Sequence, residues 1–115
     1  MLTARLHNPP NPPVSILAIV DSGADASTFH VDIAARLGID LATCRAEQRV
    51  TAGGPATVYV CSVRLEVEGK RFDADVDFNP ALHPTVALLG RHDVFRQFQL
   101  GFDQRALHLL VQPYP

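Results

Sequence analysis

The chain has 115 residues, which fits one compact domain over 1–115, and its hydrophobic fraction of 47% is enough to bury a core. Its formal net charge is -2 and its basic residues are scattered, which argues against a nucleic-acid partner. No apolar run reaches membrane-spanning length and no signal peptide opens the sequence, so we expect a soluble, cytoplasmic protein without a membrane partner.

The first third of the chain predicts two strands and a helix. Residues 2–6 alternate between apolar and polar, and the β-branched run at 14–20 is typical of a buried strand. The Pro-rich segment 9–13 between them predicts a stiff loop, because proline lacks an amide donor and breaks regular structure. Helical spacing of apolar residues predicts a helix over 31–37, which Gly38 is placed to end.

The middle of the chain predicts a long β-hairpin. The sequence Gly-Gly-Pro at 53–55, within 49–57, favours a hairpin tip. Residues 58–67 alternate as a long strand, with a slip at Cys61-Ser62 that indicates a bulge.

The return strand follows a turn at 68–70. Apolar residues alternate with Asp73, Asp75 and Asp77 along 72–78. A strand of this pattern has one face on the core and one face in water, so we expect all three aspartates to be solvated.

The last third predicts a further buried strand over 85–89, a short helix within 91–98 and a terminal hairpin made by 99–102 and 106–111. Strands therefore dominate, with two short helices, and the fold class is all-β or nearly so.

The two cysteines, Cys44 and Cys61, lie in segments of different character and form no C-x-x-C pair. This spacing does not favour a disulfide framework or a zinc site, so we expect two reduced and mostly buried thiols.

The first candidates for catalytic residues follow the strand segment 16–20. Asp21 comes directly after this apolar run, an unusual place for a charge, because an isolated buried carboxylate is costly. Ser22 supplies a hydroxyl, and Gly23 and Ala24 supply backbone N–H groups in a tight turn that can satisfy the carboxylate. The same residues also fit an Asx-type turn that only ends a strand.

A second motif, Leu89-Gly90-Arg91, ends another apolar strand. The full order is apolar strand, Asp-Ser-Gly-Ala-Asp, helix, Gly-rich hairpin, apolar strand, Leu-Gly-Arg, helix and terminal strand. Over about 14–110 this order resembles the retropepsin-like aspartic protease family. The resemblance implies a mostly β fold, a small closed β-barrel with one or two short helices, active as a homodimer on an extended peptide or protein substrate without a cofactor or metal.

The resemblance also assigns roles to the first motif. Asp21 matches the catalytic Asp, and Ser22 matches the residue whose hydroxyl braces the two active-site loops across the dimer axis. Gly23 matches the glycine whose N–H supports the carboxylate, and Ala24 completes this support of the loop.

Four further residues receive roles in the same way. Asp25 matches the Asp that contacts the substrate backbone, and Arg91 matches the Arg that forms an ion pair with it. Gly53 and Gly54 are expected to bind substrate from a flap at about 48–58.

The chain departs from the family pattern at three places. After Gly-Arg the family commonly has Asp or Asn, whereas this chain has His92, with Asp93 one position later. Pro55 follows the flap glycines, and the Pro-rich N-terminal stretch has no counterpart that the resemblance identifies.

The implied mechanism needs two carboxylates, one acting as an acid and the other as a base. The chain contains one Asp-Ser-Gly and no internal repeat, so a two-fold dimer is expected to supply the second Asp21. Two carboxylates that close share one proton, and the pair activates water for attack on the peptide carbonyl.

Two other classes of function are the alternatives to a protease, and the residues disfavour the second. A dimer of the same fold can bind or scaffold peptides without cleaving them, because a fold does not guarantee its chemistry. A metal hydrolase is the other class, but the histidines lack H-x-x-x-H or H-x-H spacing, so we expect no metal site. They are His7, His30, His83, His92 and His108.

Overall fold

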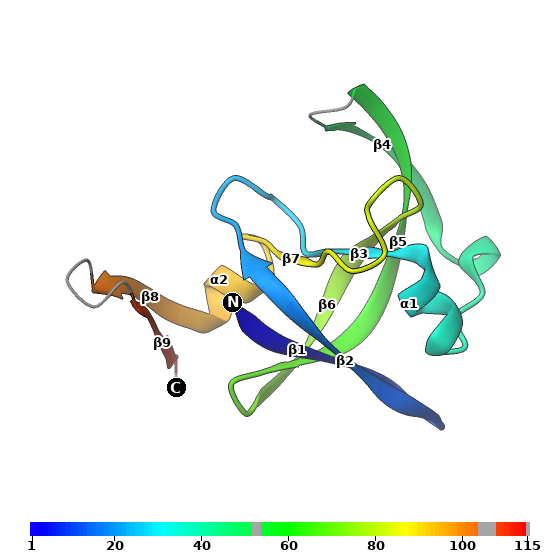
Figure 1. Cartoon of the computed structure of the whole chain (residues 1–115). Helices are drawn as coiled ribbons and strands as arrows, with labels where there is room; N and C mark the ends of the chain where they lie inside the picture. The colour runs from blue at the N-terminus through cyan, green and yellow to red at the C-terminus, as the bar shows by residue number, and fades with distance from the viewer. Residues whose placement is uncertain (52–53, 104–107, 115) are drawn as a thin grey trace.

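The computed structural model describes residues 1–51, 54–103 and 108–114, and its fold is mostly β with few helices (Figure 1). In chain order the elements are β1 (Leu2–Asn8), β2 (Asn11–Val20), β3 (Thr28–His30), α1 (Val31–Arg36), the 3-10 helix η1 (Leu41–Thr43), β4 (Arg45–Thr51), β5 (Gly54–Val67), β6 (Lys70–Asn79), β7 (Leu88–Leu89), α2 (Val94–Gln97), β8 (Phe98–Asp103) and β9 (His108–Pro113). Within these ranges, no helix has both the length and the apolar character needed to cross a membrane.

Seven strands form one sheet in the order β1-β2-β7-β3-β6-β5-β4, and β1 also pairs with β5. The pairings therefore close a ring from β1 round to β5, with β4 attached outside it. The inward-facing side chains of this ring make the core, in which the largest fully buried residues include Leu6, Phe29, Leu65, Val76 and Phe78.

Helix α1 (Val31–Arg36) confirms the helix that the apolar spacing predicted over 31–37. Ile33 and Ala34 are buried in the core cluster. The helix begins at His30, whose Nδ1 accepts a hydrogen bond from the backbone N–H of Asp32 at 3.1 Å. It ends before Gly38, which has a φ of +70°, a conformation that side chains other than glycine rarely adopt.

The predicted Pro-rich loop at 9–13 is largely wrong, because only Pro9-Pro10 forms the turn of the β1–β2 hairpin. Asn11-Pro12-Pro13 begins β2. The register shifts between Leu6 and Asn8, and this irregularity lets the prolines, which cannot donate to a strand ladder, enter the strand.

The predicted bulge at Cys61-Ser62 is also wrong. The register between β5 and β6 is continuous from the pair Tyr59–Phe78 to the end of the hairpin. The sequence alternation breaks there because Val60 and Cys61 are both buried, on opposite faces of β5. Cys61 belongs to the core, whereas Val60 lies on the face that carries the charged side chains of β4.

The aspartates of β6 do not share one solvated face as predicted. Asp73 and Asp75 are exposed, but Asp77 is only 5% exposed. Arg49 from β4 donates two hydrogen bonds to the Asp77 carboxylate, from Nε at 3.0 Å and from Nη2 at 3.2 Å. Burial of this aspartate therefore depends on a residue 28 positions away, which the local alternation cannot reveal.

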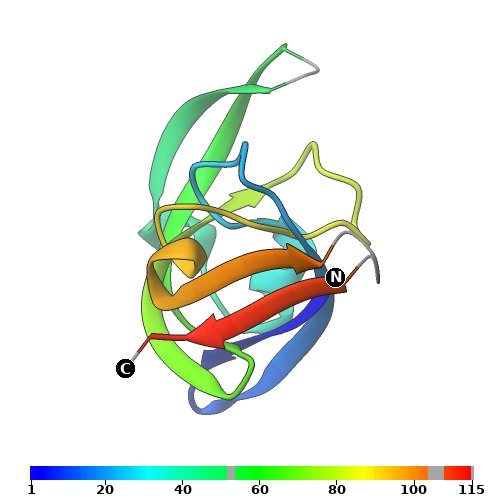
Figure 2. The same ribbon diagram turned by 90° about the vertical axis from the view of Figure 1, so that its left-hand side faces the viewer.

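The strand and the helix that precede the terminal hairpin are shorter than predicted. Strand β7 contains only Leu88–Leu89, and α2 contains only Val94–Gln97. The terminal hairpin is confirmed: β8 and β9 pair antiparallel and form a separate two-stranded sheet that extends away from the ring (Figures 1 and 2). Residues 104–107, which include part of the turn predicted at 103–105, lie outside the described residues.

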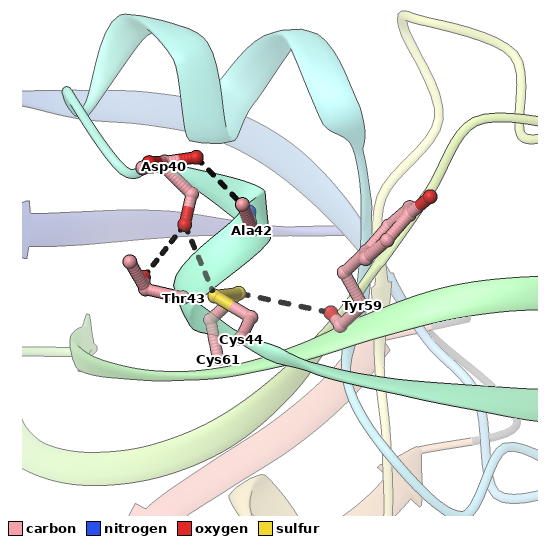
Figure 3. Close-up of a disulfide and its surroundings, with 6 residues drawn as sticks. All are labelled: Asp40, Ala42, Thr43, Cys44, Tyr59 and Cys61. Carbon is pink, nitrogen blue, oxygen red and sulfur yellow. Dashed lines mark hydrogen bonds between the residues drawn. A yellow bond between two sulfur atoms is a disulfide. The ribbon is translucent and has the colours of Figure 1, made fainter.

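The cysteines are not reduced thiols, contrary to the prediction. Cys44 and Cys61 form a disulfide, with their Cα atoms 5.1 Å apart (Figure 3). They become neighbours because the β4–β5 ladder ends with the pair Arg45–Val60, and the next opposed positions are the two cysteines. Sequence spacing alone does not show this register.

Candidate active site

Strands β2 and β7 bring the two sequence motifs to the same edge of the sheet. Strand β2 is not buried throughout as predicted, because Leu17 and Ile19 on it are exposed. Strands β2 and β7 run parallel, and the backbone N–H of Asp21 donates to the carbonyl oxygen of Leu89 at 3.0 Å. Asp21 therefore leaves its strand beside Gly90, the middle residue of the second motif. The side chain of Asp21 is partly buried at this edge.

A tight turn holds the Asp21 carboxylate. The N–H of Gly23 donates to Asp21 Oδ1 at 2.9 Å, and the N–H of Ala24 donates to the Asp21 carbonyl oxygen at 3.2 Å. A Cβ at position 23 would lie 3.2 Å from Oδ1, so a larger residue would crowd the carboxylate. Ser22 is exposed at the apex of the turn.

The second motif is joined to the far side of this turn. The N–H of Arg91 donates to the Ala24 carbonyl oxygen at 2.9 Å, and the N–H of His92 donates to that of Asp25 at 2.8 Å. The Arg91 guanidinium also donates to Asp25 Oδ1 at 2.6 Å, so the ion pair expected from the sequence is present. This hydrogen bond and the charge of Arg91 hold the pKa of Asp25 below its ordinary value.

A buried polar contact also joins the segment after β2 to the segment after β7. Ser27 Oγ donates to Asp93 Oδ1 at 2.6 Å and accepts from the N–H of Gly90 at 3.0 Å. The N–H of Ser27 donates to the other Asp93 oxygen at 3.1 Å. Ser27 is fully buried and Asp93 is 8% exposed, so these hydrogen bonds are shielded from water.

Sequence reasoning noticed Asp93 one place after His92 but gave Ser27 no role. In the structure His92 is exposed, while Asp93 caps α2 by accepting from the N–H of Val94 at 2.7 Å. The buried side chain after Gly-Arg is therefore Asp93, and His92 takes no part in this contact. The sequence did contain a signal for this contact. Ser27 lies two residues after the end of the first motif, and Asp93 lies two residues after the end of the second.

Gly90 is required by the close approach of the two loops. A Cβ at this position would lie 2.5 Å from the backbone carbon of Ala26 and 2.9 Å from the backbone nitrogen of Ser27. These are backbone atoms, so no side-chain rotation would relieve the clash.

The β4–β5 hairpin rises at the same end of the molecule as the turn at 21–27 and the loop before β7 (Figures 1 and 2). Gly54 begins β5 with a φ of +106°, which favours glycine, whereas Gly53 lies outside the described residues. The Arg49–Asp77 pair ties this hairpin to β6, and Asp77 raises the pKa of Arg49 through its hydrogen bonds.

The structure offers no metal centre in the part of the chain that it describes, since no three His, Cys, Asp or Glu side chains gather there. His30 caps a helix, His7 contacts Glu66 at 3.0 Å, and His83 contacts Thr85 at 2.8 Å. Each of these histidines thus has a local structural partner.

Two surface pockets lie away from Asp21. One, of about 450 Å³, borders the disulfide, and the other, of about 330 Å³, lies between β6 and α2. Neither is lined by Asp21 or the residues of its turn, although the second pocket reaches His92 and Asp93. The geometry that points to chemistry is the partly buried Asp21 carboxylate, supported by the Gly23 N–H at the edge of the sheet.

Comparison with known proteins agrees with this geometry. Residues 7–93 match the sequence model of the family described as aspartyl protease. No curated protein sequence matches the chain.

Three solved structures share the fold. A retropepsin-like aspartic protease from Rickettsia conorii has a TM-score of 0.67 and 23% identity, over 97% of this chain and 88% of that one. The EIAV protease complexed with the inhibitor HBY-793 has a TM-score of 0.58 and 21% identity, over 82% of each chain. The retroviral protease-like domain of Ddi1 from Leishmania major has a TM-score of 0.53 and 21% identity, over 100% of this chain and 94% of that one.

Proposed function

Because this chain belongs to the aspartyl protease family, we propose that it is an aspartic-type endopeptidase with Asp21 as its catalytic carboxylate. The observation that carries the proposal is the hydrogen bond from the Gly23 N–H to Asp21 Oδ1 at 2.9 Å. It fixes a partly buried carboxylate at the end of strand β2, where the turn supplies the partner that the charge needs. The retropepsin-like fold supports the same class of function.

The active unit is a homodimer in which Asp21 of each chain forms a catalytic dyad. The chain carries one Asp-Ser-Gly, and peptide hydrolysis needs an acid and a base at once. A two-fold axis beside the turn would bring both carboxylates together. The exposed position of Ser22 at the apex supports its role as the brace between the two turns.

The chemistry follows from two carboxylates that share one proton. The ionised member takes a proton from water as the water oxygen attacks the scissile carbonyl carbon. The protonated member polarises that carbonyl and later protonates the leaving nitrogen. Gly23 and Ala24 hold the carboxylate through this cycle because their N–H groups fix the turn.

The substrate is an extended peptide or protein segment bound by strand-like hydrogen bonds. Asp25 contacts its backbone, and Arg91 keeps Asp25 ionised and oriented. Gly53 and Gly54 contact it from the flap at about 48–58. The position of the hairpin above the Asp21 turn supports this assignment (Figure 2).

The whole chain, 1–115, acts as one domain of this dimer. The ring of strand pairings from β1 to β5 supports the closed barrel predicted for it. We propose no cofactor for the reaction and no nucleic-acid partner.

Replacement of Asp21 tests the proposal. Asp21→Asn keeps the shape of the side chain but removes the ionisable group, so cleavage of a denatured protein substrate at mildly acidic pH should fall at least roughly a thousandfold. Asp73→Asn is the matched control, because Asp73 is exposed on β6 and touches no proposed catalytic residue. Its activity should equal that of the wild type.

A wild-type protein that is folded and dimeric yet inert at acidic and neutral pH would contradict the proposal. Peptide binding under those conditions would then favour the non-catalytic binding or scaffolding dimer.

A further inference from the structure

The disulfide Cys44–Cys61 stands at the base of the β4–β5 hairpin (Figure 3). Cys44 directly precedes β4, and Cys61 lies within β5, 4% exposed and packed in the core cluster. The bond therefore attaches the residue just before the hairpin's outer strand to the hydrophobic core.

This attachment matters because the hairpin has few others. Within the described residues β4 pairs only with β5, and β5 pairs with β6 only from Tyr59 onward. Among the contacts of the described residues, the Arg49–Asp77 ion pair and the disulfide hold the hairpin to the body, in addition to the continuity of β5.

The segment that carries Cys44 is itself well ordered. Asp40 caps η1 by accepting from the N–H of Ala42 at 3.0 Å, and Thr43 Oγ1 donates to the Asp40 carbonyl oxygen at 2.7 Å (Figure 3). Loss of the disulfide would therefore remove the covalent link between the start of β4 and Cys61 without removing the turn that precedes β4.

Solvent reaches the bond. A surface pocket of about 450 Å³ is lined by both cysteines together with Asp40, Thr43 and Ser62. Cys44 is only partly buried, in contrast to Cys61, so an incoming thiol meets the Cys44 sulfur first.

We propose that Cys44–Cys61 is a site of reversible thiol–disulfide exchange with a dithiol reductant, and that its redox state sets the freedom of the flap hairpin. Its effect on cleavage rests on the proposed protease function. A thiolate of the reductant attacks Cys44 Sγ, the protein disulfide breaks, and Cys61 leaves as a thiolate that takes up a proton. The second thiol of the reductant then displaces Cys44, so the reductant ends as a disulfide and the protein gains two thiols.

Hydrogen exchange tests the structural part of the proposal without any need for activity. The full-length protein is prepared oxidised and after treatment with dithiothreitol, and alkylation followed by mass measurement counts its thiols. Backbone amides of β4 should exchange at least roughly fivefold faster in the reduced protein, while those of β1 and α1 keep their rates. The proposal would be overturned if the β4 amides exchanged at the same rate in the oxidised and reduced proteins although alkylation showed two free thiols. It would also be overturned if the bond resisted reduction in the folded protein.

Steady-state cleavage tests the functional part. A looser flap must be ordered when substrate binds, so reduction should raise KM several-fold while kcat changes less than about twofold. Cys44→Ser should show the raised KM without reductant and should not respond to dithiothreitol. If this variant does not fold, the reduced wild type carries the same test.

The outcomes separate the two proposals. A protein that cleaves with the same KM and the same exchange rates in both redox states refutes the switch and leaves the protease function intact. A protein that is inert in both states, yet exchanges faster at β4 when reduced, refutes the protease function and retains the exchange site.

Discussion

The contact between Ser27 and Asp93 shows how single residues secure the candidate active site. Both side chains are buried, and together they satisfy the N–H groups of Gly90 and Val94. A buried polar group that loses its partner is costly, so each member of the contact depends on the others.

Removal of the Ser27 hydroxyl should therefore destabilise the fold. Ser27→Ala leaves the Gly90 N–H without its acceptor and Asp93 Oδ1 without its strongest donor, and the free energy of unfolding should fall by about 1–3 kcal/mol. Denaturant unfolding measures the change. Ser62→Ala, at an exposed position, should alter it by less than about 0.5 kcal/mol, and a similarly small effect at Ser27 would show that the contact contributes little.

The Asp25–Arg91 ion pair predicts a dependence of stability on pH. Arg91 lowers the pKa of Asp25 from its ordinary value of 3.8. A carboxylate with a lowered pKa stabilises the fold above that ordinary value, and this contribution disappears as pH falls through the lowered, folded-state pKa.

We therefore expect the wild type to be more stable than Asp25→Asn at neutral pH, with the same difference down to about pH 4 and none at more acidic pH. Unfolding midpoints of both proteins across this range provide the test. A difference that grows as pH falls below the ordinary pKa would contradict the assigned ion pair. Both side chains are exposed, so added salt should weaken the effect.

At the scale of elements, the β4–β5 hairpin is held down by charge as well as by its ladder. Arg49 contacts the buried Asp77 of β6 and also donates to Glu47 on its own strand at 2.7 Å. The charged row of β4 lies opposite Val58 and Val60, which are buried although they do not belong to the core cluster. Charged side chains thus cover an apolar face of the hairpin.

Arg49→Met should leave the Asp77 carboxylate buried and unpaired. The expected loss is about 1–3 kcal/mol in the free energy of unfolding, reduced from the value for a fully buried pair because Arg49 is partly exposed. Arg45→Met is the matched control on the same strand. Arg45 is 62% exposed, so its loss should cost less than about 0.5 kcal/mol, and equal effects at the two positions would exclude a specific tether.

At the scale of the whole molecule, the proposed dyad requires two chains. Refolding the wild type with a roughly tenfold excess of Asp21→Asn would place most wild-type chains in mixed dimers that carry one catalytic carboxylate. Cleavage per wild-type chain should then fall roughly tenfold. The same excess of an unrelated folded protein controls for competition as substrate, and undiminished cleavage would mean that one chain suffices.

The disulfide also bears on where the protein works. The cytoplasmic location stays a prediction, and most stable disulfides occur in oxidising compartments. Cytosolic disulfides are typically transient and redox-sensing, which is the behaviour proposed for Cys44–Cys61. A cytoplasmic location and an exchangeable bond are therefore compatible.

The sequence alone predicted the elements whose signals are local. Alternation marked the long hairpin, helical spacing and Gly38 marked α1, and the two short motifs identified the aspartic protease family, which the comparisons confirm. Strand alternation and turn chemistry act between near neighbours, so they can be read without knowing the fold. The supported Asp21 turn belongs to the same class, because Gly23 is two residues away.

Only the tertiary structure decided the contacts between distant segments. Ser27 meets Asp93 across 66 residues, Arg49 meets Asp77 across 28, and Cys44 meets Cys61 across 17. Each of these pairs overturned or extended a sequence prediction: a solvated aspartate proved buried, two thiols proved bonded, and a serine without a role proved central to the loops. Local periodicity says which face a residue takes, whereas strand register and loop crossing determine which distant residue it meets there.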